Sequence, residues 1–172
     1  QPGSLHTIRY GADLPIYTLD SADYTLPFED IILQSNRDTQ RAGTSPLIQV
    51  EAGRVELGDG AILECGSLGM ILRSYGASGL MEDGAIIRNC RSKLDNASAV
   101  SVGFWNTDVK KDDSPTFTMT GGSVCNNKAT NSSTGHGGGV FDGDDRVPED
   151  IRLLIGTVKN AGDTVIYEKD QF

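Results

Sequence analysis

Apolar and polar residues alternate in short runs along most of this chain, and turn residues separate the runs. Val55 and Leu57 would point to one face of a strand, and Glu56 to the other. Residues 116–119 repeat the alternation. Runs of about four such residues, bounded by glycines, are typical of short β-strands that each bury one face. The pattern therefore predicts an all-β protein.

The strand and turn pattern recurs from residue 46 onward. The turn residues Gly60 and Gly84 are 24 positions apart, whereas Gly84 and Gly122 are 38 apart because an insertion lies between them. Three short strands in each period of about 24 residues are typical of a parallel β-helix. We expect about four to five coils, with an antiparallel sandwich as the alternative architecture.

Equivalent positions of successive coils should stack along the axis of such a solenoid. We expect Ile62, Ile86 and Val124 to form one buried column. We expect Asn89 and Asn127 to form a polar column at the following bend, where their amides can hydrogen-bond to turn carbonyls.

Residues 1–45 do not follow the repeat. Within them, Phe28, Ile31 and Ile32 would share one face of a helix, while residues 31–33 could equally form a buried strand. A solenoid needs a terminal unit that covers its first coil. We therefore predict an N-terminal cap over residues 1–45 and a parallel β-helix over residues 46–172.

Composition narrows the choice of partners. The chain has 172 residues, a net charge of −9 and a pI near 4.6, and it contains no basic stripe to neutralise phosphates, which argues against nucleic acid as a partner. No apolar run is long enough to span a membrane. For the three cysteines, Cys65, Cys90 and Cys125, we expect buried free thiols, with one disulfide as the alternative.

The third coil carries a more specific pattern. FTM at residues 117–119, GGSVCNNKA at 121–129 and GHGGGVF at 135–141 resemble the repeat of bacterial surface-exposed right-handed β-helix proteins of the adhesin-like and polymorphic outer-membrane types. The resemblance implies a secreted or surface-anchored protein, often adhesive, with some relatives acting as glycoside hydrolases or lyases. It assigns no catalytic residue, because Gly121, Gly122 and Asn127 match the scaffold alone.

Insertions into the coils are the places where function is expected. Residues 103–114 contain an aromatic pair with nearby carboxylates: Phe104, Trp105, Asp108, Asp112 and Asp113. An exposed ring can cover the apolar face of a sugar while polar groups bind its hydroxyls. These residues are our candidate ligand site; alternatively, Trp105 packs on its own loop.

Two further insertions are polar. Residues 126–138 contain His136, a candidate ligand-binding residue or a solvated one. Residues 142–150 contain Asp142, Asp144 and Asp145, whose oxygens would suit calcium as the one candidate cofactor. Paired carboxylates also suit glycoside hydrolysis, and a solvated acidic turn is the third interpretation.

These observations favour an extracellular module that binds a glycan or a host or surface protein. One alternative is a β-helix glycoside hydrolase or polysaccharide lyase, or a subunit of one, that uses Asp142, Asp144 and Asp145, or Asp112 and Asp113. A purely structural stalk segment is the third option.

Two structural expectations accompany these functions. The insertions at 103–114 and 142–150 follow equivalent strands and should emerge on the same flank. At the C-terminal end, we expect another chain to dock and bury Val165 and Tyr167, because an open β-helix end exposes strand edges.

Overall fold

The part of the protein that the structure describes is all-β, and its strands are parallel. The computed structural model describes residues 5–11, 14–35, 45–64, 68–73, 76–92, 99–102, 115–129 and 140–142. Every element in these ranges is a strand, and every strand pair is parallel. The all-β prediction is therefore confirmed, and an antiparallel sandwich is excluded for this part of the chain. No helix within it is long and apolar enough to cross a membrane.

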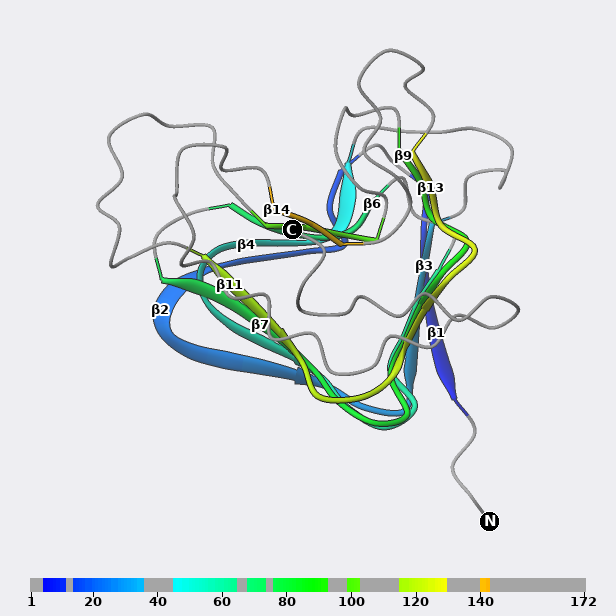
Figure 1. Ribbon diagram of the computed structural model, residues 1–172, viewed down its shortest axis with the longest axis horizontal. Coiled ribbons are helices and arrows are strands. Elements are labelled where there is room, and N and C mark those ends of the chain that lie inside the picture. The colour runs from blue at the N-terminus through cyan, green and yellow to red at the C-terminus, as the bar shows by residue number, and fades with distance from the viewer. Residues whose placement is uncertain are drawn as a thin grey trace, which may run out of the picture.

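One sheet forms a single side of the molecule (Figure 1). Its five strands are, in order of pairing, β1 (His6–Tyr10), β3 (Ile31–Ser35), β5 (Ile62–Glu64), β8 (Ile86–Arg88) and β12 (Ser123–Cys125). The neighbours in this order come from segments far apart in the sequence, as parallel pairing requires.

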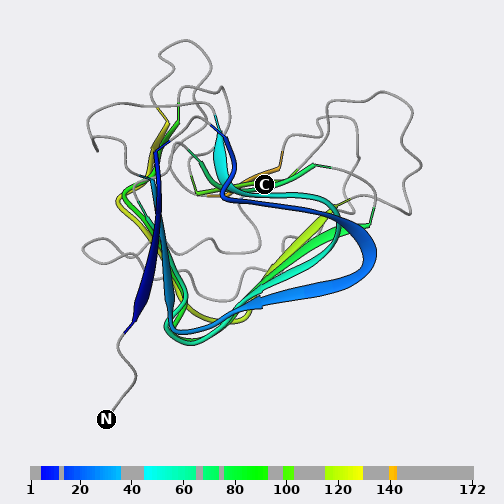
Figure 2. The same ribbon diagram turned by 180° about the vertical axis from the view of Figure 1, so that it is seen from behind.

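A larger sheet forms the two other sides and bends where they meet (Figures 1 and 2). Its long strand β4 (Pro46–Leu57) pairs with β6 (Leu68–Leu72) along its first half and with β7 (Ala77–Met81) along its second half. The remaining strands are β2 (Tyr17–Phe28), β10 (Val100–Val102), β11 (Thr116–Met119) and β14 (Val140–Asp142). A separate pair joins β9 (Arg91–Ser92) to β13 (Lys128–Ala129).

The chain passes along the three sides in the same order several times. One pass, here called a layer, comprises β4 and β5; the next comprises β6, β7 and β8, and a later one β10, β11 and β12. Equivalent strands of consecutive layers pair with one another, so each strand lies over its counterpart (Figure 2). The core lies inside the three sides.

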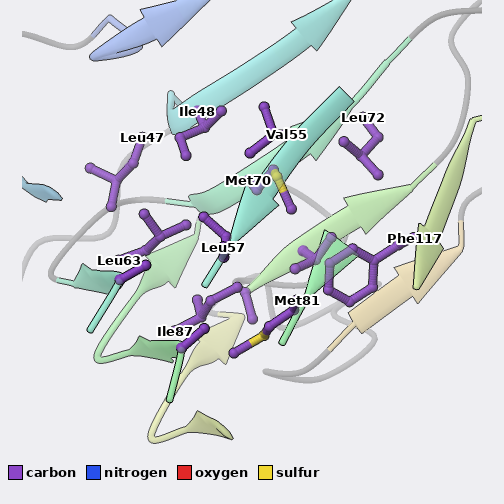
Figure 3. Packing of buried hydrophobic residues seen from close by; sticks show 14 of the residues in the cluster. Leu47, Ile48, Val55, Leu57, Leu63, Met70, Leu72, Met81, Ile87 and Phe117 are labelled. Carbon is purple, nitrogen blue, oxygen red and sulfur yellow. The ribbon is translucent and has the colours of Figure 1, made fainter. Parts of the chain in front are cut away.

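The core column on the five-stranded side differs from the predicted one. Leu33, Leu63, Ile87 and Val124 are paired in register and are nearly inaccessible to solvent (Figure 3 shows Leu63 and Ile87). Ile62 does pair with Ile86, but Ile86 is only half-buried and pairs with Ser123.

The predicted column of Ile62, Ile86 and Val124 is therefore wrong by one position at Val124. Four residues, 82–85, connect β7 to β8, whereas three residues, 120–122, connect β11 to β12. Because side chains alternate between faces, one missing residue moves the whole strand by one register position.

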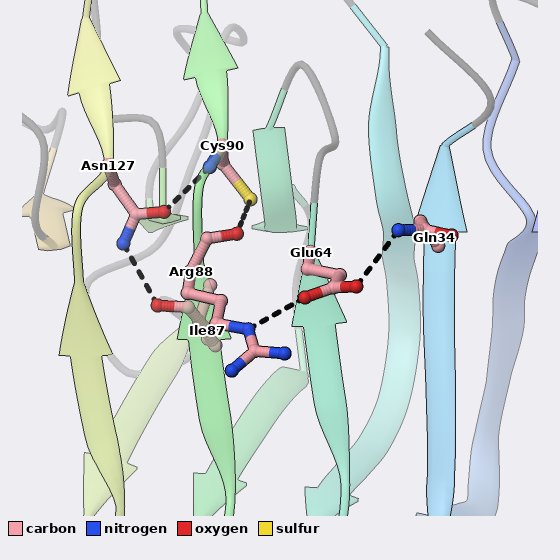
Figure 4. A network of polar contacts seen from close by, with 6 residues as sticks. All are labelled: Gln34, Glu64, Ile87, Arg88, Cys90 and Asn127. Carbon is pink, nitrogen blue, oxygen red and sulfur yellow. Dashed lines mark hydrogen bonds and ion pairs between the residues drawn. The ribbon is translucent and has the colours of Figure 1, made fainter. Parts of the chain in front are cut away.

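The asparagine column is also displaced by one residue. Asn89 and Asn126 share the left-handed conformation, with φ of 57° and 55°, and follow directly after the paired residues Arg88 and Cys125. Asn127 instead bridges two layers (Figure 4): its Oδ1 accepts from the Cys90 N–H at 2.9 Å and its Nδ2 donates to the Ile87 carbonyl at 3.0 Å. An asparagine amide does bond to the backbone here, but its carbonyl partner lies in strand β8, whereas turn carbonyls were expected.

The N-terminal segment belongs to the same sheets as the rest of the chain. Residues 31–33 form part of β3, so the strand interpretation is confirmed and the helical one is wrong. β3 pairs with β5 and β2 pairs with β4. The predicted division at residue 45 therefore does not separate two sheets, and the capping role of residues 1–45 stays a prediction.

Two cysteines lie in the interior. Cys90 and Cys125 are buried thiols that form no disulfide, as predicted, while Cys65 lies outside the described residues.

Candidate functional site

Most of the candidate ligand and metal residues lie outside the part of the chain that the structure describes. They are Phe104, Trp105, Asp108, Asp112, Asp113, His136, Asp144 and Asp145. Asp142 is placed by its backbone, as the last residue of β14. The strands that border each insertion are described, and they locate the points at which the insertions leave the sheets.

The insertions at 103–114 and 142–150 leave from adjacent positions. β10 and β14 are parallel neighbours, with Val100 opposite Val140 and Val102 opposite Asp142. Neighbouring strands are about 4.8 Å apart, so the two segments begin at the same edge, one above the other. This supports the expectation that they share a flank, while a contact between them stays a prediction.

The same edge of the sheet carries the irregular connections of the other layers. We call it the insertion corner; its described residues are 20–24 within β2, 51–53 within β4, Arg73 and Gly76 between β6 and β7, and the strand ends Val102 and Asp142. The register between β2 and β4 shifts on both sides of Asp20, which leaves residues 21–24 as an outward bulge.

Gly53 is the point on which this bulge rests. Its φ is +91°, and a side chain there would meet the carbonyl oxygens of Ser21 and Tyr24. The backbone of β2 therefore approaches Gly53 of β4 too closely for any residue other than glycine.

The bulge carries exposed polar and aromatic side chains. Tyr24 is 67% exposed, and Asp20 and Asp23 beside it are also exposed. An aromatic ring among carboxylates is the same combination that the insertion at 103–114 carries. Tyr24 was not among the predicted site residues, although its place directly after Asp23 and near Asp20 was a usable signal.

A small polar cluster occupies the next layers at this corner. Glu51 Oε1 accepts hydrogen bonds from Gln49 Nε2 at 2.5 Å and from Arg73 Nη1 at 3.5 Å. Arg73 Nε is buried and has no hydrogen-bond partner among the described residues. Arg73, whose side chain is 42% exposed, thus places a guanidinium group at the corner, next to the strand from which residues 103–114 leave.

The segment that contains His136 begins in a different sheet. It follows β13, which pairs with β9, and it ends at Val140, the first residue of β14. The insertion corner lies at the other end of β14, after Asp142. The structure therefore does not bring the borders of this segment to the corner.

No group of three or more metal-ligating side chains occurs within the described residues. The calcium prediction for Asp142, Asp144 and Asp145 depends on side chains outside them, so it stays a prediction.

No family model matches this chain, and the searches of curated proteins and of solved structures also found no match.

Proposed function

We propose that the chain is a right-handed parallel β-helix of about four to five coils that acts as a binding module on a bacterial surface or in the extracellular space. The parallel strands and their layered pairing support the β-helix. The resemblance of residues 117–141 to surface-exposed repeats supports the location. The ligand is a glycan or a host or surface protein, bound at the insertion corner.

A single observation carries the location of the site. The pairing of Val102 with Asp142 starts two insertions, one rich in aromatic and acidic residues and one rich in acidic residues, at adjacent points. Tyr24, in the bulge next to Gly53, and Arg73, directly after the residue that pairs with Val102, lie at the same edge. Rings that cover the apolar face of a sugar, beside donors and acceptors for its hydroxyls, are what carbohydrate binding needs.

The test is a glycan array with the whole chain, with and without calcium. We expect binding that Trp105→Ala reduces by tenfold or more. Tyr10→Ala, which removes an exposed tyrosine from β1 on another side of the molecule, is the matched control and should leave binding unchanged. Equal losses in both variants, or no ligand on the array, would contradict the proposed site.

The alternative function is cleavage of the bound glycan by carboxylates of the two insertions. The carboxylates of Asp112, Asp113, Asp142, Asp144 and Asp145 support it, because glycoside hydrolysis uses an acid and a base or nucleophile. New reducing ends would appear when the chain is incubated with an oligosaccharide that it binds. Their loss in Asp144→Asn, with binding retained, would favour the enzyme over the binding module.

A further inference from the structure

The outer edge of β1 has no partner strand among the described residues. β1 stands at the end of the five-stranded sheet and pairs with β3 alone. The His6 N–H donates to the Asp30 carbonyl at 3.2 Å, so this group faces β3. Because successive N–H groups of a strand point to opposite edges, those of Thr7 and Arg9 face outward.

The core column is incompletely covered at this edge. Ile8 is the first member of the column that continues through Leu33, Leu63 and Ile87. Ile8 is half-buried, whereas Leu33 and Ile87 have no exposed surface. One further apolar side chain next to Ile8 would complete the column and remove apolar area from water.

A polar column beside it also ends at β1. Arg9 Nε donates to Gln34 Oε1 at 2.7 Å, Gln34 Nε2 donates to Glu64 Oε1 at 2.9 Å, and Arg88 Nε donates to Glu64 Oε2 at 2.6 Å. Figure 4 shows the part from Gln34 to Arg88. The terminal nitrogens of Arg9 have no partner among the described residues. A carboxylate in the next strand would continue the column as Glu64 does beside Arg88.

The neighbouring edge strand, β2, is poorly suited to pairing. It contains Pro27, which has no N–H, and the exposed Asp20 and Asp23. Proline and charge are common devices that block strand addition. A second copy that paired through its own β1 would bring no carboxylate to Arg9, because this strand (HTIRY) has no acidic residue. β1 contains neither proline nor acid, so the edges favour a foreign strand on β1 over a second copy.

We propose that β1 binds an extended segment of a partner protein by strand addition, with an apolar residue next to Ile8 and a carboxylate next to Arg9. Backbone groups of Thr7 and Arg9 supply the hydrogen bonds, and the two columns supply the sequence preference. The proposal does not rest on glycan binding, because β1 lies on a different side from the insertion corner (Figure 1).

The probe is a peptide with the chain's own sequence DGAILE, residues 59–64. Leu63 occupies the column of Ile8, and Glu64 occupies the column of Arg9. The matched control is the same peptide with lysine in place of glutamate. Amide shifts in NMR spectra of the whole chain report the affinity and identify the strand that binds.

We expect the glutamate peptide to shift the amides of residues 6–10 and to bind about fivefold more tightly than the lysine peptide, as an opposite-charge cross-strand pair predicts. Arg9→Glu should reverse the preference. Thr7→Pro should abolish binding of both peptides, because it removes an outward donor, and leave the thermal unfolding midpoint nearly unchanged.

Three results would overturn the proposal. They are undiminished binding to Thr7→Pro, an unaltered peptide preference in Arg9→Glu, and a dimer of the free chain in sedimentation that Thr7→Pro dissociates. The last result would assign the edge to a second copy. If Thr7→Pro lowers the midpoint, the preference reversal in Arg9→Glu decides alone.

Discussion

Two corners of this molecule solve the same geometrical problem in opposite ways. The chain passes from the larger sheet into the five-stranded sheet just before β3, β5, β8 and β12, at a corner here called the tight corner. Each layer turns there at one residue with positive φ. These residues are Asp30, Gly60, Gly84 and Gly122, with φ of 50°, 70°, 84° and 83°. At the insertion corner the number of residues between strands varies widely: β4 passes through without a break, whereas residues 103–115 separate β10 from β11.

The difference lies in how closely the layers approach. At the tight corner the carboxylate of Asp30 lies over Gly60, that of Asp59 over Gly84, and that of Asp83 over Gly121. A methyl group on Gly84 would overlap Asp59 Oδ1 and lie 2.9 Å from its Cα. Gly76, at the insertion corner, also has positive φ, yet a methyl group there meets nothing within 4 Å. Close stacking fixes the register at the tight corner, whereas at the insertion corner it occurs at Gly53 and is absent at Gly76, where the layer has room for additional residues.

The largest effect should come from the register that the tight corner imposes on β8. Ile87 points into the core and Ile86 does not, although they are adjacent and identical. Ile87→Ala should lower the free energy of unfolding by about 2–5 kcal/mol through lost burial and a cavity. Chemical denaturation measures it, and Ile86→Ala is the matched control with a clearly smaller loss. Equal losses would show that the register is wrong.

A pair of glycine variants compares the corners directly. Gly84→Ala combines left-handed strain with overlap against Asp59, and should cost about 2–4 kcal/mol. Gly76→Ala carries the strain alone and should cost about 1–2 kcal/mol. Both values come from thermal or denaturant unfolding. If Gly76→Ala proves the more damaging variant, the insertion corner is the more closely packed one.

Asn127 tests the bend that follows β12. Asn127→Ala leaves the Cys90 N–H and the Ile87 carbonyl without this partner, so we expect a loss of about 1–3 kcal/mol. Asn126→Gly changes the neighbouring residue at a position with φ of 55°, where glycine is well tolerated, and should shift stability by less than about 1 kcal/mol. Hydrogen exchange at the Cys90 amide should accelerate only in Asn127→Ala.

Much of the scaffold could be predicted because its signals are local. Alternation identified the buried Val55 and Leu57, and the turn glycines marked Gly60, Gly84 and Gly122. The register of β12 with β8 could not be predicted in the same way. Counting from the last glycine equates Val124 with Ile86, but Ser123 is the residue that pairs with Ile86. Ala61 and Ala85 lie between the earlier glycines and their strands, whereas β12 begins directly after Gly122.

The candidate site was less accessible to prediction. That Tyr24 and Arg73 share an edge with the insertions depends on pairings between β2 and β4 and between β6 and β10. Residues 20–24 show no repeat, and Asp30 takes a positive φ that other layers assign to glycine. Sequence periodicity cannot detect a layer whose turn uses a different residue type.

The smallest effect on stability, with the largest on binding, should come from shortening the insertion corner. Residues 73–76 (RSYG) join Leu72 to Ala77; Leu72 lies in register with Val102, and Ser78, directly after Ala77, lies in register with Thr116, directly after Pro115. Replacing residues 103–114 by RSYG therefore supplies a connection already used in the adjacent layer. Closing a loop of 4 rather than 12 residues costs about 1 kcal/mol less entropy, so stability should change by no more than about that amount.

Unfolding experiments on this variant measure the contribution of residues 103–114 to stability, and the glycan array measures their contribution to binding. We expect an unchanged or slightly raised unfolding midpoint and a complete loss of glycan binding, while the peptide DGAILE still shifts the amides of β1. A loss of several kcal/mol would mean that residues 103–114 pack on the sheets as part of the core. In that case the contrast between the tight corner and the insertion corner would not hold, because both corners would then depend on close packing.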